Sequence, residues 1–220
     1  MTNIKLKVCG MCQPENIREI VQLQPDYMGL IFFKKSSRFV KAEIPEISSE
    51  VKKTGVFVNA SIDFILKKLE KYQLQAIQLH GEESAEFCRG LRQKLKDKNI
   101  EIIKVFSVKE EFNFDVLEQY EGTADYFLFD TKGKNKGGNG ITFNWEVLKN
   151  YPSTTPFFLS GGIGIEEAKE IKELVQWFQQ NKKEQLLYAV DVNSRFEDAP
   201  GLKNIEKLQL FKDSLAKNNY

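Results

Sequence analysis

The chain has 220 residues, of which 41% are hydrophobic and 29% are charged, with 17 phenylalanines and a formal net charge of +1. This length fits one large domain or two small ones, and single α/β barrels commonly have ~200–250 residues. The near-zero net charge provides no overall field that would favour nucleic acid, so any attraction for anions must be local.

The cysteines, Cys9, Cys12 and Cys88, are odd in number, which argues against a disulfide framework. Cys9 and Cys12 have C-x-x-C spacing, but there is no second cysteine pair and only one histidine, His80, so we expect no zinc site. The N-terminus has no signal-type apolar core, and the longest apolar run, 28–33, is too short to span a bilayer. We therefore expect a cytoplasmic protein with no membrane segment.

Strands and helices alternate through the first half of the chain. The predicted strands are apolar runs that end at glycine or polar residues, namely 6–10, 27–33, 54–59 and 76–81. The predicted helices are 14–21, a weakly patterned segment at 44–53, one capped by Ser61, and 84–95.

The second half continues the alternation. Its predicted strands are 101–107, 125–130, 156–160 and 186–192. Its predicted helices are 111–120, one starting at Asn144, 165–179, and a last one capped by Asn204, with a loop or short turn at 194–201. Eight strand–helix units without a break in composition predict one α/β domain over 1–220, a single-domain (β/α)8 TIM barrel. A doubly wound open sheet is the alternative, because local patterns do not show closure.

In such a barrel, the active site lies at the C-terminal ends of the strands. The polar residues expected there include Cys9, Arg38, Asn59, His80, Ser107, Asp130, Asp191 and Asn193. Asp130 ends an aromatic strand before a glycine-rich loop, 131–140, that carries three lysines. A thiol such as Cys9 acts as a base only as the thiolate, whereas a buried strand-end cysteine otherwise serves as a small apolar filler.

Two further features suggest an anionic substrate. Gly161 and Gly162 precede a helix, where backbone N–H groups can approach a phosphate, although a tight turn would use the same residues. Arg38 can hold a planar carboxylate through paired hydrogen bonds. Nucleotide-binding glycine fingerprints are missing from the sequence.

Together these stretches resemble the phosphoribosylanthranilate isomerase family of tryptophan biosynthesis, in the family's order and over nearly the whole chain. The matching segments are 7–11, 37–40, 55–59, 78–81, 129–132, 137–140, 160–162, 191–194 and 200–201. The resemblance implies an Amadori rearrangement of N-(5-phosphoribosyl)anthranilate without a cofactor or metal, because the substrate nitrogen is the electron sink. It implies that Asp130 is the general acid for ring opening and that Cys9 is the general base at sugar C2.

The same resemblance implies the substrate contacts. Arg38 would hold the anthranilate carboxylate, Gly161, Gly162, Asn193 and Ser194 would bind the phosphate, and His80 and Asp191 would complete the site. The loop after Asp130 would fold over the substrate. Arg195 departs from the pattern, because the family usually has glycine there; its side chain either points outward or joins the phosphate.

Two alternatives compete with this interpretation. The histidine-pathway isomerase performs the same rearrangement on another aminoaldose, but it carries aspartate where Cys9 stands. A non-catalytic barrel that senses sugar phosphates is the second, and the retained thiol and acid argue against it. The expected partner is a small phosphorylated molecule rather than nucleic acid, and the expected assembly is a monomer or homodimer.

Overall fold

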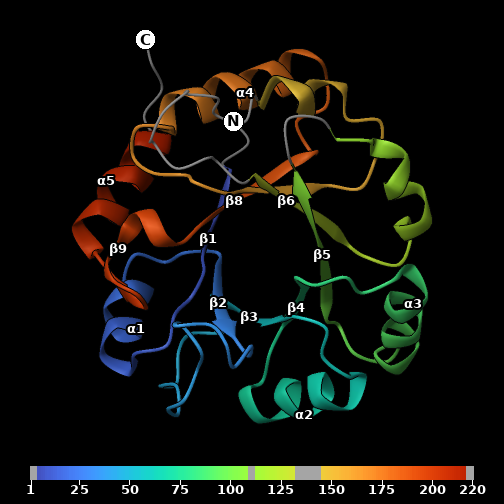
Figure 1. Cartoon of the computed structure of the whole chain (residues 1–220). Coiled ribbons are helices and arrows are strands. Elements are labelled where there is room, and N and C mark those ends of the chain that lie inside the picture. The colour runs from blue at the N-terminus through green and yellow to red at the C-terminus, as the bar shows by residue number, and fades with distance from the viewer. Residues whose placement is uncertain (1–3, 109–111, 132–144, 217–220) are drawn as a thin grey trace.

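Eight parallel strands close into a barrel in a computed structural model that describes residues 4–108, 112–131 and 145–216. Each strand pairs with its neighbour in the sequence, and the first strand also pairs with the last, which closes the ring (Figure 1). The predicted (β/α)8 barrel is therefore confirmed and the open sheet is wrong. The strands are β1 (Lys5–Val8), β2 (Tyr27–Ile31), β3 (Lys52–Phe57), β4 (Ala76–Leu79), β5 (Glu101–Val108), β6 (Tyr126–Thr131), β7 (Phe157–Ser160) and β8 (Leu187–Val192).

Helices surround the barrel on its outside (Figure 1). The α-helices are α1 (Pro14–Val21), α2 (Ile62–Tyr72), α3 (Ala85–Lys94), α4 (Ala168–Gln180) and α5 (Ile205–Ala216), and the 3₁₀ helices are η1 (Phe114–Tyr120), η2 (Trp145–Asn150) and η3 (Ser194–Phe196). Ser61 caps α2 by accepting from the Phe64 N–H at 3.3 Å, as predicted. Asn204 likewise accepts from the Lys207 N–H at 2.9 Å at the start of α5.

Apolar side chains fill both sides of the strand wall. Inside the barrel, one cluster of buried residues comprises Tyr27, Ala76, Ile103, Val105, Leu128, Phe158 and Ala189. Outside it, a larger core between strands and helices contains many of the phenylalanines, whose rings meet edge to face; Phe106, for example, lies 5.4 Å from Phe127 between centroids. Each buried phenylalanine stabilises the fold by roughly 1.5–3 kcal/mol.

The predicted helix at 44–53 is wrong. Residues 42–51 are irregular, and β3 begins at Lys52. Pro45 disfavours helical backbone at the residue before it, and the Ser48 hydroxyl accepts from the Glu50 N–H at 3.3 Å, which forms a local turn. The apolar residues here anchor an irregular segment against the core, with Val51 only 4% exposed.

Smaller differences occur elsewhere. The described part of the predicted 111–120 helix is the 3₁₀ helix η1, and the helix predicted at 165–179 begins three residues later, as α4. The predicted 194–201 loop contains η3 and the strand β9 (Glu197–Ala199), which pairs with β10 (Leu202–Lys203) as a small antiparallel sheet.

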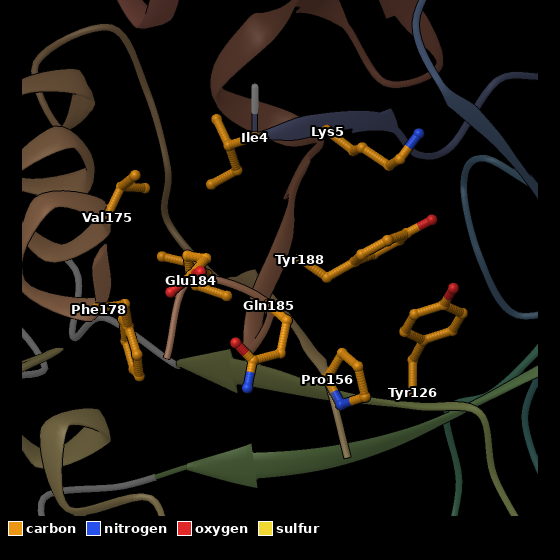
Figure 2. Close-up of a pocket in the computed structure, with 10 residues that line it drawn as sticks. Ile4, Lys5, Tyr126, Pro156, Val175, Phe178, Glu184, Gln185 and Tyr188 are labelled. Atoms are coloured by element: carbon orange, nitrogen blue, oxygen red, sulfur yellow. The ribbon is translucent and has the colours of Figure 1, made fainter. Parts of the chain in front are cut away.

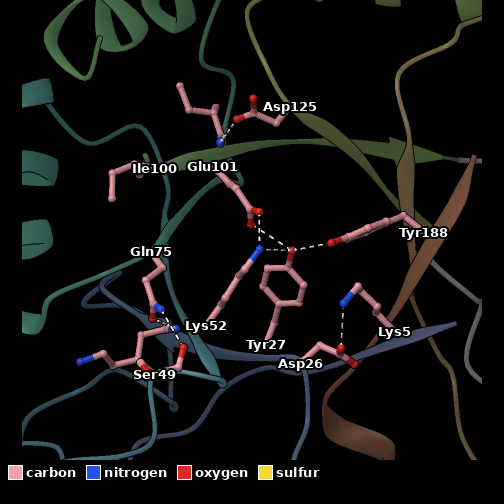
Figure 3. Close-up of polar contacts among 12 residues, drawn as sticks. Lys5, Asp26, Tyr27, Ser49, Lys52, Gln75, Ile100, Glu101, Asp125 and Tyr188 are labelled. Carbon is pink, nitrogen blue, oxygen red and sulfur yellow. Dashed lines mark hydrogen bonds and ion pairs between the residues drawn. The ribbon is translucent and has the colours of Figure 1, made fainter. Parts of the chain in front are cut away.

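The N-terminal end of the barrel is closed by polar contacts (Figure 3). The Tyr27 hydroxyl donates to Glu101 at 2.9 Å and lies 3.1 Å from the Tyr188 hydroxyl, while Lys52 pairs with Glu101 at 2.5 Å. Lys5 pairs with Asp26 at 3.0 Å beside them. These groups satisfy one another, which is typical of the stabilising end of a barrel rather than its active end.

Candidate active site

A cavity of about 190 Å³ opens at the C-terminal ends of the strands. It collects most of the residues that the sequence predicted for the site, although they come from five separate strand ends. The described residues that line it are Cys9, Ile31, Val56, His80, Asp130, Ser160, Gly161, Gly162, Ile163, Asp191, Asn193, Ser194 and Arg195.

Cys9 follows β1, and its side chain is 5% exposed at the cavity wall. Gly29 on the neighbouring strand makes room for it, because a Cβ at Gly29 would lie 2.7 Å from the Cys9 Sγ. Burial, and to a smaller extent the Asp191 carboxylate, raise the pKa of the Cys9 thiol above its ordinary value, while the ammonium groups of Lys7 and Lys203 act to lower it. The thiol is therefore positioned for contact with a ligand, and its charge depends on nearby lysines.

Lys7 was not predicted as a site residue. It lies two positions before Cys9 on the same inward face of β1, and its Nζ is 2.9 Å from Asp191 Oδ1 on β8. The lysine side chain is 0% exposed and the aspartate 5%. The signal that would have found it is the alternation of β1, which predicts that a lysine two residues before Cys9 shares its face.

Asp130 belongs to β6, and its side chain reaches the same cavity as Cys9. The His80 Nε2 lies 3.5 Å from Asp130 Oδ2. The Gln78 amide nitrogen is 2.8 Å from His80 Nδ1 and donates to it in this orientation, which leaves the Nε2 hydrogen directed toward Asp130. His80 thus lies between the Asp130 carboxyl and the buried Gln78 side chain.

One edge of the cavity consists of two loops. Gly161 and Gly162 have φ angles of +97° and +68°, a backbone conformation that favours glycine. Ser194 begins η3 on the adjacent loop, and Arg195 follows it. Arg195 lines the cavity. Its Nη2 also lies 3.7 Å from a Glu166 carboxylate oxygen and 3.8 Å from a Glu167 carboxylate oxygen, just before α4.

Arg38 is not among the described residues that line this cavity. Its Nε and Nη2 donate to Glu197 at 2.8 and 2.6 Å. Lys203, which is buried, donates to Asn193 at 2.8 Å and to Glu197 at 2.5 Å. Burial alone would raise the pKa of Glu197, but these hydrogen bonds outweigh it and lower the pKa below its ordinary value. Arg38 is thus tied to the Asn193 loop through a charged network.

The lysine-bearing loop after β6, with the predicted helix start at Asn144, lies outside the described residues. Of the predicted strand-end residues, Asn59 and Ser107 do not appear in the described cavity wall.

A larger cavity of about 370 Å³ lies at the opposite end of the barrel (Figure 2). Tyr126 and Tyr188 stack there at 4.4 Å beside Pro156, Val175 and Phe178. Its described lining has no cysteine or histidine and only one carboxylate, that of Glu184. Acid–base groups converge on the smaller cavity, so the smaller cavity is the candidate active site.

A closed (β/α)8 barrel with a thiol, a carboxyl and a glycine turn around one small cavity at the C-terminal ends of its strands has the architecture of a barrel enzyme with a small substrate. The family model "N-(5'phosphoribosyl)anthranilate (PRA) isomerase" matches residues 6–214. A relative from Parabacteroides distasonis, named N-(5'-phosphoribosyl)anthranilate isomerase, is 42% identical, covering 94% of this chain and 90% of its own. The chain belongs to the phosphoribosylanthranilate isomerase family.

Solved structures agree with this assignment. The phosphoribosyl anthranilate isomerase from Thermotoga maritima has a TM-score of 0.74 and 28% identity, covering 97% of this chain and 98% of its own. Another isomerase of this name, in complex with reduced 1-(o-carboxyphenylamino)-1-deoxyribulose 5-phosphate, has a TM-score of 0.72 and 27% identity over the same shares. In the described part of the chain, no helix is long and apolar enough to cross a membrane.

Proposed function

We propose that the protein converts N-(5-phosphoribosyl)anthranilate to 1-(2-carboxyphenylamino)-1-deoxyribulose 5-phosphate, as a step of tryptophan biosynthesis. Membership of the family supports the substrate and the reaction class. The observation that carries the residue roles is that Cys9 and Asp130, from non-adjacent strands, line one cavity bordered by Gly161 and Gly162. An Amadori rearrangement needs one proton donor and one proton acceptor placed around a sugar, and this cavity offers both.

In the proposed mechanism, Asp130 donates its proton to the furanose ring oxygen. The C1–O bond breaks while the nitrogen lone pair forms the C1=N bond of a Schiff base. The Cys9 thiolate then removes the proton from C2, and the electrons of that bond form C1=C2 and neutralise the iminium. The resulting enolamine loses its O2 proton and gains one at C1, which gives the ketone. At that point Cys9 carries one extra proton and Asp130 lacks one, and exchange with water restores both.

Binding of the two anionic ends follows from the cavity wall. The backbone at Gly161 and Gly162, together with Asn193 and Ser194, forms the proposed phosphate end, which is supported by their shared lining of the cavity. Arg195 is the only Lys or Arg in the described lining, and we assign it a side-chain contact to the phosphate.

The other end of the substrate carries a carboxylate. Arg38 is the proposed partner, through the Nη1 amino group that its Glu197 contacts leave unengaged. His80 and Asp191 are the remaining proposed contacts. His80 holds the Asp130 carboxyl from one side, which keeps the acid directed into the cavity.

We further propose a cytoplasmic enzyme that acts as a monomer or a homodimer. Three free cysteines agree with a reducing compartment. One structural relative, from Thermotoga maritima, is described as a dimeric isomerase, which keeps the homodimer among the expected assemblies.

The decisive assay follows the loss of substrate fluorescence with folded, reduced protein. Turnover by the wild type, with losses of ~10²–10⁴-fold in Cys9→Ala and Asp130→Asn, is the expected result. Cys12→Ala is the matched control, because Cys12 does not line the described cavity and lies near Gly201 instead. Absence of turnover combined with tight binding of the product would instead identify a sugar-phosphate sensor.

A further inference from the structure

A buried ion pair forms the floor beneath the candidate base. Lys7 and Asp191 face each other across the seam where β1 pairs with β8. Their charged atoms lie 2.9 Å apart, and both side chains are almost fully buried. Lysine is rarely buried without a partner, and a buried pair is weak evidence for stability, since its desolvation cost offsets its attraction. The proposed proton transfers do not use Lys7.

The position of Lys7 relative to Cys9 suggests what the pair does. Lys7 and Cys9 are inward-facing neighbours on β1, and the positive charge of Lys7 lowers the pKa of the Cys9 thiol. Burial alone would lower the pKa of Lys7, but Asp191 and Cys9 outweigh it and raise the pKa, so the amine stays charged. A fixed ammonium therefore lies two residues before the thiol on the same face of β1, in a buried part of the barrel wall.

Other charged groups face Cys9 as well. The charged and titratable groups that surround Cys9, taken from every neighbouring element, are Lys7, His80, Asp130, Asp191, Lys203 and Arg38. Lys203 and Arg38 are both hydrogen-bonded to Glu197, which balances part of their charge. Lys7 is the one of these cations that lies on the same strand and face as the thiol.

We propose that Lys7 is a positioning residue that stabilises the Cys9 thiolate, and that Asp191 keeps its ammonium in place. This inference rests on the proposed function, in which Cys9 is the base. A nearby cation favours the charged form of a thiol, which is the form that removes the C2 proton. Lys7 exchanges no proton in the cycle; it remains an ammonium throughout.

Two readouts test the proposal. Alkylation of Cys9 by iodoacetamide, measured from pH 6 to 10 with the labelled peptide identified by mass spectrometry, reports the thiolate directly and needs no turnover. The pH profile of kcat reports the same group during catalysis. In Lys7→Met, we expect alkylation at pH 7 to be about 10–100-fold slower, with the ascending limb of both profiles, where Cys9 loses its proton, moved up by about one pH unit or more. Lys7→Arg keeps the charge and should restore most of the alkylation rate.

Lys104→Met is the matched control. Lys104 pairs with Glu83 at 3.2 Å, both side chains are at most 4% exposed, and the pair lies on the outside of the barrel wall. This variant loses an equally buried lysine, so it reveals what general destabilisation does. It should leave the Cys9 alkylation profile unchanged.

The result that would overturn the proposal is an alkylation profile of Lys7→Met that matches the wild type, or one displaced equally in Lys104→Met. If Lys7→Met does not fold, the double variant Lys7→Met/Asp191→Leu removes both charges and leaves no unpaired carboxylate. The carboxylate of Asp191 raises the pKa of Cys9, but by less than Lys7 lowers it, so this variant should still alkylate more slowly than the wild type. Slower alkylation in that variant supports the proposal, and wild-type alkylation refutes it. Failure of the isomerase assignment would appear separately, as absent turnover in the wild type with the alkylation shift intact.

Discussion

Gly29→Ala tests the position of the thiol with the smallest change that the structure allows. The added Cβ would lie 2.7 Å from the Cys9 Sγ and 3.0 Å from the Cys9 Cα. Ordinary contact requires about 3.5–4.0 Å, so the sulfur must retreat by about 1 Å and the two strands must separate slightly. Misplacement of this size costs about 10²-fold in rate, and overpacking costs about 1–3 kcal/mol of unfolding free energy. We therefore expect kcat to fall about 100-fold with a small change in KM.

Steady-state fluorescence kinetics and urea unfolding measure both effects in one preparation. Gly90→Ala is the control, because the nearest atom to its added Cβ, Ile62 Cδ1, is 3.6 Å away in an α-helix. That change should stabilise the protein by about 0.5–1 kcal/mol and leave kcat unaltered. A Gly29→Ala enzyme with kcat within threefold of the wild type would show that catalysis does not depend on where the Cys9 sulfur sits, and Cys9 would lose its role as base.

Two further predictions concern charged residues around the loops after β7 and β8. Arg195→Gly should raise KM and the inhibition constant of inorganic phosphate about 10-fold, with kcat within twofold. The reason is that the variant loses the proposed charge-assisted hydrogen bond to the phosphate, made by a half-exposed side chain. Unchanged phosphate inhibition would show that Arg195 serves only its contacts with the glutamates before α4. Glu197→Gln should reduce the unfolding free energy at pH 7 by about 3 kcal/mol, since Arg38 and Lys203 lose their counter-charge. The folded-state pKa of Glu197 lies below its ordinary 4.5, so its stabilisation is present above that pH and is lost as the pH falls through the folded-state value. The difference between variant and wild type should therefore shrink by pH 3, and a constant difference would contradict the sign.

Local patterns predicted the strands because parallel strands buried on both faces are continuous apolar runs. The segment 125–130 is an example: aromatic residues fill the wall, and the last position, Asp130, opens into the cavity. The helix at 44–53 failed for the opposite reason. Its apolar residues, which include Ile44 and Ile47, hold an irregular segment against the core, and periodicity does not distinguish that arrangement from a helix.

Contacts between distant strands could not be predicted from local patterns. Lys7 and Asp191 meet only because the barrel closes between its first and last strands, and the sequence left closure undecided. The partner of Arg38 was missed similarly, since Glu197 comes from a short strand that was expected to be loop. The sequence therefore predicted which residue types line the site. It did not predict the ion pairs that control their pKa values, because those pairs form only in the folded barrel.

The inward residues of β1 show how charge is distributed along the barrel interior. Lys5 pairs with Asp26 at the N-terminal end, where both side chains are more than one-third exposed, whereas Lys7 pairs with Asp191 in full burial. Replacing a buried pair with apolar residues of similar volume is often neutral or stabilising by about 1–4 kcal/mol. Lys7→Met/Asp191→Leu should therefore unfold at a urea concentration equal to or above that of the wild type while its Cys9 alkylates slowly. Such a separation of stability from reactivity would show that the pair is needed for the thiol; a large loss of stability would show that the barrel itself depends on it.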